Sequence, residues 1–263
     1  MTHRFRYLAA ALAIALAVVS PAFAQGTNGL IEGAVLDQQG LALPGVVVTA
    51  TNTSNGFARS ATTDAAGTYR IPGLPVGVYD VKAALSGFAA QARKANVNVE
   101  STTVVPFRMS VAGQTEVVEV TAEAPLIDSK DSGVGEVITA VQIENLPLNG
   151  RQFGNLAALV PGVSLGYHTD PTKSTQFAPQ VAGGGGRNIN YLIDGGDNND
   201  DTVGGLVQNF PLDSIGEFKF ETQRFRADTG RANGGTIKVV TKSGTNDFKG
   251  SLFEYFRDKS MNS

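Results

Sequence analysis

Short runs of hydrophobic and β-branched residues alternate with turn residues along residues 30–109. The first two runs, Leu30–Leu36 and Val46–Thr51, are separated by the polar turn Asp37–Gly40 and by the pair Pro44-Gly45. Turns recur about every ten residues, which leaves room for six or seven short strands over about eighty residues. This pattern predicts a small antiparallel β-sandwich.

Individual strands of this region show the two-residue period of a sheet with one buried face. Tyr79, Val81 and Ala83 alternate with charged neighbours, so their three side chains are expected in the core. A tight turn is expected at Asp64–Gly67, because Asp and Gly are favoured at such positions, and this turn separates two further strands.

Residues 138–249 mix helical and strand patterns. Thr139 and Gln142 have the spacing of a capping box, in which the two side chains satisfy the free amides at the start of a short helix. A second short apolar helix is predicted at Gln152–Val160, ending at Pro161. Strands are predicted at Asn190–Asp194, at 217–221 and at Thr236–Thr241.

The strand at 217–221 is expected to bury one face only. Phe218 and Phe220 alternate there with Glu217, Lys219 and Glu221, so the phenylalanines should face a core and the charged residues should face solvent. With the first region, this predicts a β-rich α+β protein, in which an antiparallel β-sandwich is followed by a mixed α/β domain.

The first 24 residues have the pattern of a secretory signal peptide. Arg4 and Arg6 make the start positive, Tyr7–Val19 is an almost unbroken apolar run, and Ala22-Phe23-Ala24 supplies a small-x-small cleavage site. An apolar run of this length is short of the ~20 residues that a membrane-spanning helix needs. A retained anchor is the less favoured alternative. The protein is therefore expected to be exported, with Gln25 as its first mature residue.

Composition removes several classes of function. The chain has no Cys, which excludes a disulfide scaffold, an iron–sulfur protein and thiolate-bound zinc. Its formal net charge is −3, so no basic face indicates a nucleic-acid partner. Glycine, at 31 of 263 residues, is well above average usage and favours turn-rich β structure over a helix bundle.

Three short segments resemble catalytic or ligand-binding motifs, but their neighbouring residues or their spacing do not fit those motifs. Gly162–Gly166 has the letters of a nucleophile elbow, but Pro161 precedes it and the sole mature histidine, His168, follows too closely. Asp194–Asp201 has a calcium-loop texture, but it lacks the Gly and Glu that an EF-hand requires, and a solvated acidic loop is favoured over an irregular calcium site. Gly183–Gly186 lacks the spacing of a phosphate-binding loop. We therefore expect no catalytic residue, no metal and no cofactor.

Residues 112–137 connect the two patterned regions and contain a short β-capable segment followed by a polar stretch. Two interpretations of the segment stand side by side. It could be a last strand of the sandwich, which the segment alone favours, or a strand that pairs with the sheet edge of another protein through main-chain hydrogen bonds. The segment consists of Glu116, Val117, Val118, Glu119, Val120 and Thr121.

The turn spacing of residues 30–110 resembles the carboxypeptidase-regulatory-like domain. The resemblance rests on Gly33–Val35, Pro44–Val46, Thr63–Tyr69, Gly77–Val81 and Gly87-Phe88. That family is a non-catalytic, transthyretin-like β-sandwich found as an accessory module. The resemblance thus implies a binding or spacer module.

Four blocks further along, in the family's order, resemble the plug domain of TonB-dependent outer-membrane receptors of Gram-negative bacteria. They are Leu146–Phe153, Leu159–Val163, Arg187–Gly195 and Gly234–Asn246. A receptor subfamily carries a carboxypeptidase-regulatory-like domain ahead of the plug and places its TonB box between the two. The resemblance implies that residues 116–121 are a TonB box, that TonB, with ExbB and ExbD, is the partner, and that the location is the outer membrane.

The resemblance also divides the chain. It implies a signal peptide at 1–24, the sandwich at 28–110, a linker with the candidate box at 111–136, and the plug at 137–247. Residues 248–263 are then the start of a first barrel strand, since Phe248–Phe256 resembles that strand and the rest of the barrel is expected to be missing. The implied function is the N-terminal and plug portion of an energy-coupled transporter for an unidentified ligand. The alternative is a secreted or surface adhesion module that binds protein or glycan without transport.

The signal-peptide interpretation predicts the mature terminus. When the chain is expressed with export, N-terminal sequencing of the product should begin at Gln25, because signal peptidase cuts after the small-x-small pattern. Retention of Met1 on membrane-associated protein would contradict it.

Overall fold

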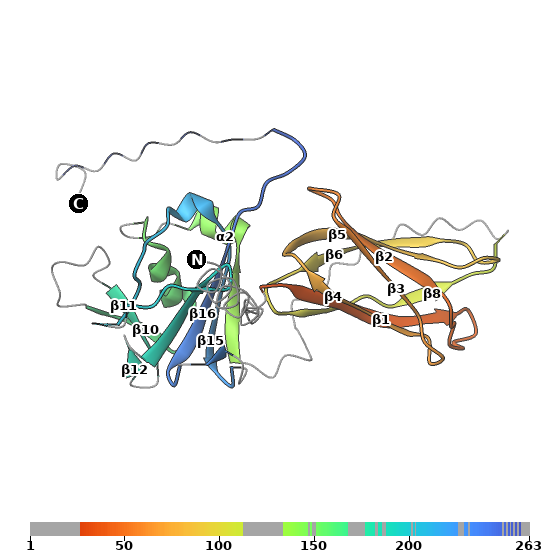
Figure 1. Cartoon of the computed structure of the whole chain (residues 1–263), viewed down its shortest axis with the longest axis horizontal. Coiled ribbons are helices and arrows are strands. Elements are labelled where there is room, and N and C mark those ends of the chain that lie inside the picture. The colour runs from red at the N-terminus through yellow and green to blue at the C-terminus, as the bar shows by residue number, and fades with distance from the viewer. Residues whose placement is uncertain are drawn as a thin grey trace, which may run out of the picture.

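The structure is a computed structural model, and it describes residues 27–112, 134–146, 148, 151–167, 177–181, 184–185, 188–200, 202, 204–225, 229–230, 232–248 and, beyond these, 250, 252, 254, 256 and 258. Figure 1 shows two bodies, which we call the sandwich (residues 29–112) and the second domain (residues 134–248). Each has a hydrophobic core of its own. The predicted signal peptide and the segment 116–121 lie outside the described residues.

The sandwich consists of two four-stranded sheets. One has the order β4-β1-β7, with β8 also paired to β1, and β1 is antiparallel to β4 but parallel to β7 and β8. The other, β3-β2-β5-β6, is antiparallel throughout. The strands are β1 (Gly29–Asp37), β2 (Val47–Asn52), β3 (Ala58–Thr62), β4 (Thr68–Leu74), β5 (Gly77–Ala84), β6 (Gln91–Val97), β7 (Thr102–Val104) and β8 (Phe107–Met109).

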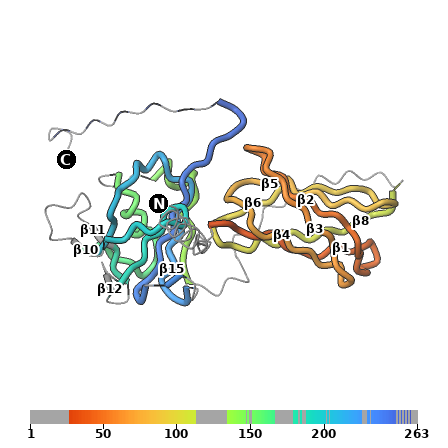
Figure 2. The backbone as a smooth tube through the Cα atoms, in the orientation of Figure 1, coloured from red at the N-terminus to blue at the C-terminus, as the bar shows by residue number. Residues whose placement is uncertain are grey.

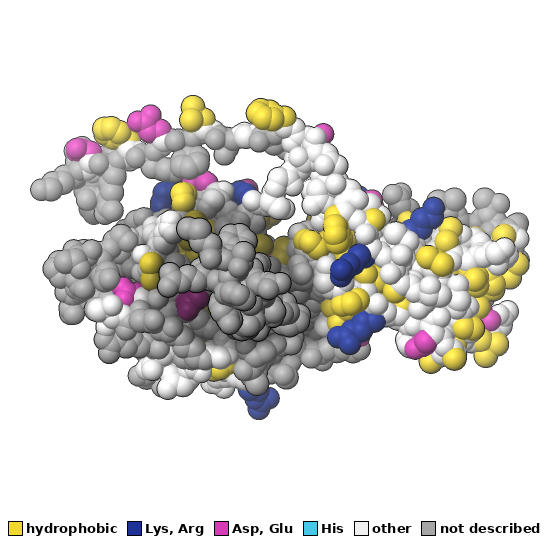
Figure 3. Space-filling view, viewed as in Figure 1, with side chains coloured by type: hydrophobic (Ala, Val, Ile, Leu, Met, Phe, Trp, Pro, Cys, Tyr) yellow, Lys and Arg dark blue, Asp and Glu magenta, His cyan; other side chains and the backbone are white. Residues whose placement is uncertain are grey.

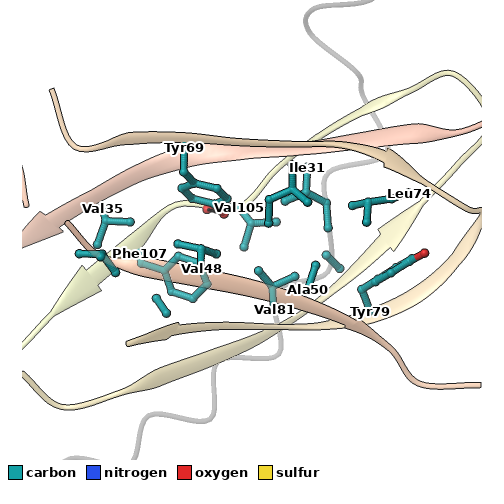
Figure 4. Close-up of a cluster of buried hydrophobic side chains, with 14 of the residues drawn as sticks. Ile31, Val35, Val48, Ala50, Tyr69, Leu74, Tyr79, Val81, Val105 and Phe107 are labelled. Atoms are coloured by element: carbon teal, nitrogen blue, oxygen red, sulfur yellow. Dashed lines mark hydrogen bonds between the residues drawn. The ribbon is translucent and has the colours of Figure 1, made fainter. Parts of the chain in front are cut away.

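The core of the sandwich lies between these sheets and confirms the predicted periodicity. Tyr79, Val81 and Ala83 on β5 are completely buried, while the charged residues between them are exposed. Figure 4 shows the side chains of Tyr79 and Val81 facing those of the opposite sheet, such as Ile31 and Tyr69. The Tyr69 hydroxyl donates to the Val105 carbonyl at 2.6 Å, so its polar end is satisfied inside the core.

The predicted turn at Asp64–Gly67 is present and is organised by one carboxylate. Asp64 Oδ1 accepts from the amides of Ala66 and Thr68, both at 2.9 Å, and Oδ2 accepts from the Thr68 hydroxyl at 2.7 Å. These hydrogen bonds, that of the Thr68 hydroxyl most of all, lower the pKa of Asp64. Gly67 has φ of +71°, a conformation that glycine adopts without strain.

The second domain is built on a five-stranded sheet of order β14-β13-β16-β15-β9. Strands β13 and β16 are parallel, and the other neighbours are antiparallel. A separate three-stranded sheet has the order β10-β11-β12. The strands are β9 (Val134–Thr139), β10 (Val163–Tyr167), β11 (Phe177–Val181), β12 (Gly184–Gly185), β13 (Ile189–Ile193), β14 (Gly196–Asp197), β15 (Ile215–Gln223) and β16 (Gly235–Thr241).

Short helices contribute to the core of this domain on one face of the large sheet. They are α2 (Ala140–Asn145) and the 3₁₀ helices η2 (Phe153–Leu159) and η4 (Leu212–Ser214). Ile143 of α2 and Phe153 of η2 pack in one cluster with Phe218 and Phe220 of β15. Gln142 Oε1 accepts from the Thr139 amide at 2.9 Å, as the predicted capping box requires.

The chain beyond β16 runs past the sandwich before it leaves the body of the molecule (Figures 1 and 2). Phe248, Leu252 and Phe256 are highly exposed, and the described residues of 248–256 belong to no strand. In Figure 3 the hydrophobic side chains of this segment stand apart from the rest of the surface.

Among all the described residues, no helix has the length and apolar character needed to cross a bilayer.

The packing of the sandwich predicts that replacing two different phenylalanines has very different effects on its free energy of unfolding. Phe107→Ala should lower the free energy of unfolding of the sandwich by about 3–5 kcal/mol, because Phe107 is 2% exposed and its removal leaves a cavity. Phe57→Ala is the matched control, since Phe57 is exposed, and should change it by less than about 1 kcal/mol. Hydrogen exchange of the β5 amides measures both values, and equal losses would contradict this packing.

Candidate functional site

Four charged side chains gather on the face of the large sheet opposite the phenylalanines. Lys219 on β15 lies directly across from Lys238 on β16, an arrangement of like charges that destabilises a sheet by itself. Glu221 lies between them and pairs with both. Its Oε1 is 3.0 Å from Lys219 Nζ and its Oε2 is 2.9 Å from Lys238 Nζ. One carboxylate therefore compensates two ammonium groups, and Glu217 is the fourth member of this charged face.

The prediction that this face is open to solvent is wrong. Glu217, Lys219, Glu221 and Lys238 are between 2% and 5% exposed, as deeply buried as the phenylalanines on the other face. Burying charges costs free energy unless they are paired and hydrogen-bonded. The period of two along β15 correctly separates the apolar from the charged residues, but it contains no information about what covers the charged side.

A turn of the sandwich supplies part of that cover. Residues Asn98–Ser101 connect β6 to β7, and the Val99 amide donates to Glu217 Oε1 at 2.7 Å. The next residue, Glu100, pairs through its carboxylate with Lys238 Nζ. Lys238 is thus held by one carboxylate from its own sheet and one from the sandwich.

The turn has a strained backbone that directs these groups. Glu100 has φ of +47°, in the left-handed region that a side chain disfavours by about 1–3 kcal/mol. The Ser101 hydroxyl accepts from the Asn98 amide at 3.2 Å and donates to the Asn98 carbonyl at 3.0 Å, which closes the turn. Sequence reasoning missed Glu100, because nothing in the local pattern marks one acidic residue in a turn as the partner of Lys238.

Glu217, on the charged face of β15, has a shifted pKa. Burial raises its pKa to about 7, and the Val99 amide and the charge of Lys219 offset part of that effect. Because its ordinary value is 4.5, the folded arrangement favours the protonated carboxyl. The contribution of Glu217 to stability is thus fully present below pH 4.5 and is lost as the pH rises through about 7.

A second contact joins the two bodies at a distance from the charged cluster. Asn246, which follows β16, donates its amide to the Ser54 carbonyl at 3.1 Å and its side-chain Nδ2 to the Asn55 carbonyl at 3.0 Å. Ser54 and Asn55 form the turn between β2 and β3, which Asn52 supports by accepting from the Ser54 amide at 2.9 Å. Two separated polar contacts therefore fix how the sandwich meets the second domain.

The acidic loop after β13 uses its carboxylates within the fold. Asp194 accepts from both the amide and the hydroxyl of Thr241, at 2.9 and 2.8 Å. Asp197 accepts from the Asn199 amide at 2.9 Å, and Asp200 accepts from the Thr202 amide at 2.8 Å. Within the described ranges, no three acidic or imidazole side chains come close enough to hold a metal ion.

The nucleophile-elbow pattern of the sequence has a definite position in the fold. Ser164 of the elbow-like pattern is inside strand β10, paired with Gln180 of β11, and so does not sit on a strand-to-helix turn. His168, and the candidate box at 116–121, lie outside the part of the chain that the structure describes.

Residues 30–110 match the family described as carboxypeptidase regulatory-like domain. The chain is also 30% identical over 244 residues to the TonB-dependent transporter Oar of Myxococcus xanthus. That alignment covers 89% of this chain and 22% of the relative, so the chain spans about a fifth of the transporter's length. The two matches together support an N-terminal region of a TonB-dependent receptor.

Solved structures resemble parts of the chain much more distantly. A dioxygenase domain from Streptomyces sp. SirexAA-E is 15% identical, with 35% of this chain and 86% of that chain covered, at a TM-score of 0.27. The pilus 2b backbone protein of group B streptococcus is 17% identical, with 32% and 41% covered, at the same TM-score of 0.27. Likeness at this level carries no argument about function.

The charged cluster predicts unequal effects of removing two lysines that both pair with glutamates. Lys238→Ala should destabilise the second domain by about 3–5 kcal/mol, because Glu221 and Glu100 lose a buried partner. Lys242→Ala is the matched control. Its pair with Glu144 is exposed and contributes at most about 1 kcal/mol. Urea unfolding followed by circular dichroism compares the two, and a loss at Lys238 no larger than that at Lys242 would show that the buried network is unimportant for stability.

Proposed function

We propose that this chain is the periplasmic and plug portion of an energy-coupled outer-membrane receptor. In this proposal the second domain is the plug, which gates the barrel of the receptor, and the sandwich is an accessory module. Residues 116–121 are the strand that TonB captures, with ExbB and ExbD supplying the energy. The observation that carries the proposal is the 30% identity to a TonB-dependent transporter, which extends over 89% of the chain and so includes both bodies.

The pairing of the large sheet supports this proposal from inside the fold. Two of the blocks that resemble the plug family, Arg187–Gly195 and Gly234–Asn246, contain β13 and β16, which are neighbours in parallel register. Asp194, in a left-handed conformation at the end of β13, accepts two hydrogen bonds from Thr241 at the end of β16. The two sequence blocks thus form neighbouring strands of one sheet.

The place of residues 116–121 along the chain supports their assignment as the docking strand. They lie between the sandwich, whose last described residue is Ala112, and the edge strand β9, which begins at Val134. A segment with alternating valines can add to a sheet edge of a partner, where main-chain hydrogen bonds give affinity and alternate side chains give specificity.

Proline substitution tests the docking strand directly. An added strand must donate its amide hydrogens, and proline has none, so Val118→Pro and Val120→Pro should each abolish capture of the chain by the periplasmic domain of TonB. Ser129→Pro, in the same linker but outside the segment, is the matched control and should leave capture unchanged. Unchanged pull-down by both valine variants would show that 116–121 is not the box, and no capture of the unaltered chain would favour an adhesion module.

A further inference from the structure

We propose that the charged face of β15 and β16 is a releasable docking site for the Asn98–Ser101 turn, so that the sandwich and the second domain form a proton-sensitive latch. The latch consists of Glu217, Glu221 and Lys238 on the sheet, with Val99 and Glu100 on the turn. It goes beyond the proposed receptor function, because it concerns how the two bodies of this chain hold one another.

The contacts between the two bodies have the character of a separable interface. Those that join the turn to the sheet, and Asn246 to the β2–β3 turn, are hydrogen bonds and one ion pair. Each body has its own apolar core, and neither described core cluster includes residues of the other body. Polar interfaces between independently packed domains permit relative motion, unlike large hydrophobic ones. The sandwich can therefore leave the sheet without losing its own core.

Separation would remove the cover that the turn gives to Glu217. In the docked state it faces the Val99 amide from the sandwich and Lys219 from its own strand, while Lys238, Glu221 and Glu100 form the adjoining ion pairs. Thr139 is its neighbour on β9 and carries no charge. Undocking returns Glu217 to water, where the charged form is favoured, so release of the sandwich is coupled to release of a proton.

This coupling determines how docking depends on pH. Docking should be tightest in acid and should weaken as the pH rises toward and beyond 7, since the docked carboxyl has a pKa of about 7 and an ordinary one has 4.5. Between pH 5.5 and 8.5 these values correspond to a fall of about 30-fold in the docking equilibrium constant, if undocking restores the ordinary pKa.

Distance measurement tests the latch without any partner. The chain has no native cysteine, so Thr62→Cys on β3 and Gln223→Cys on β15, both exposed, take one spin label each. Pulsed electron paramagnetic resonance on the whole chain should give a single narrow distance at pH 5.5. At pH 8.5 a broad second population should appear, with the docked-to-undocked ratio lower by at least about tenfold. A distribution that does not change with pH would overturn the proposal.

Two variants in the labelled chain identify the groups responsible. Glu217→Gln keeps the side-chain oxygen that accepts from Val99 but cannot ionise, so its distribution should stay narrow at both pH values. Glu100→Gln removes one charge opposite Lys238 and should broaden the distribution at both. Glu136→Gln, an exposed residue of β9, is the control and should behave as the parent chain.

The outcomes separate the latch from folding and from the receptor function. Amides within β5 and β16 should stay protected from hydrogen exchange in all variants, so a broad distribution cannot be ascribed to unfolding. If Glu217→Gln retains the pH response of the parent chain, or if Glu100→Gln stays as narrow as the control, the latch is wrong. TonB capture does not enter this measurement, so loss of the docking-strand proposal would leave the latch result intact, and the reverse also holds.

Discussion

The pairing of Glu221 with two lysines is the interaction on which the rest of the arrangement depends. Lys219 and Lys238 face each other across neighbouring strands, and without the carboxylate between them the sheet would place two like charges together in a buried layer. With Glu221 in place, the charged face can be buried, and the Lys238 ammonium group can still pair with a second carboxylate from outside the sheet. Glu100 of the sandwich is that second partner.

This constraint explains why the two bodies meet as they do. The sandwich has a hydrophobic core of its own, and its Asn98–Ser101 turn makes specific polar contacts with the second domain through the Val99 amide and the Glu100 carboxylate. Polar contacts require particular geometry, which the left-handed conformation of Glu100 provides at the turn. Glu100 adopts this conformation while its carboxylate pairs with Lys238 and the neighbouring Val99 amide donates to Glu217.

Features that depend on residues close together in the sequence are predicted well, and features that depend on distant residues are not. The strands of the sandwich, the Asp64–Gly67 turn and the helix that begins after Thr139 depend on neighbours a few residues away, and all three are confirmed. The segment at 152–160 was correctly predicted to be helical and apolar, although it is a 3₁₀ helix, Phe153–Leu159. The solvent exposure predicted for the charged residues of β15 is wrong, because exposure depends on what packs above the strand.

The amino-acid sequence alone is enough to predict the two patterned regions, the alternation that separates Phe218 and Phe220 from the charged residues of β15, and the resemblance that points to a TonB-dependent receptor. These are properties of residue order, since hydrophobic period and turn chemistry act locally. Packing in three dimensions buries the charged face and brings Glu217 to the Val99 amide 118 positions away. It also places Lys238 between two carboxylates. Hydrogen bonds and ion pairs act over a few ångströms in space, and no pattern along the chain specifies which distant residues the fold brings within that range.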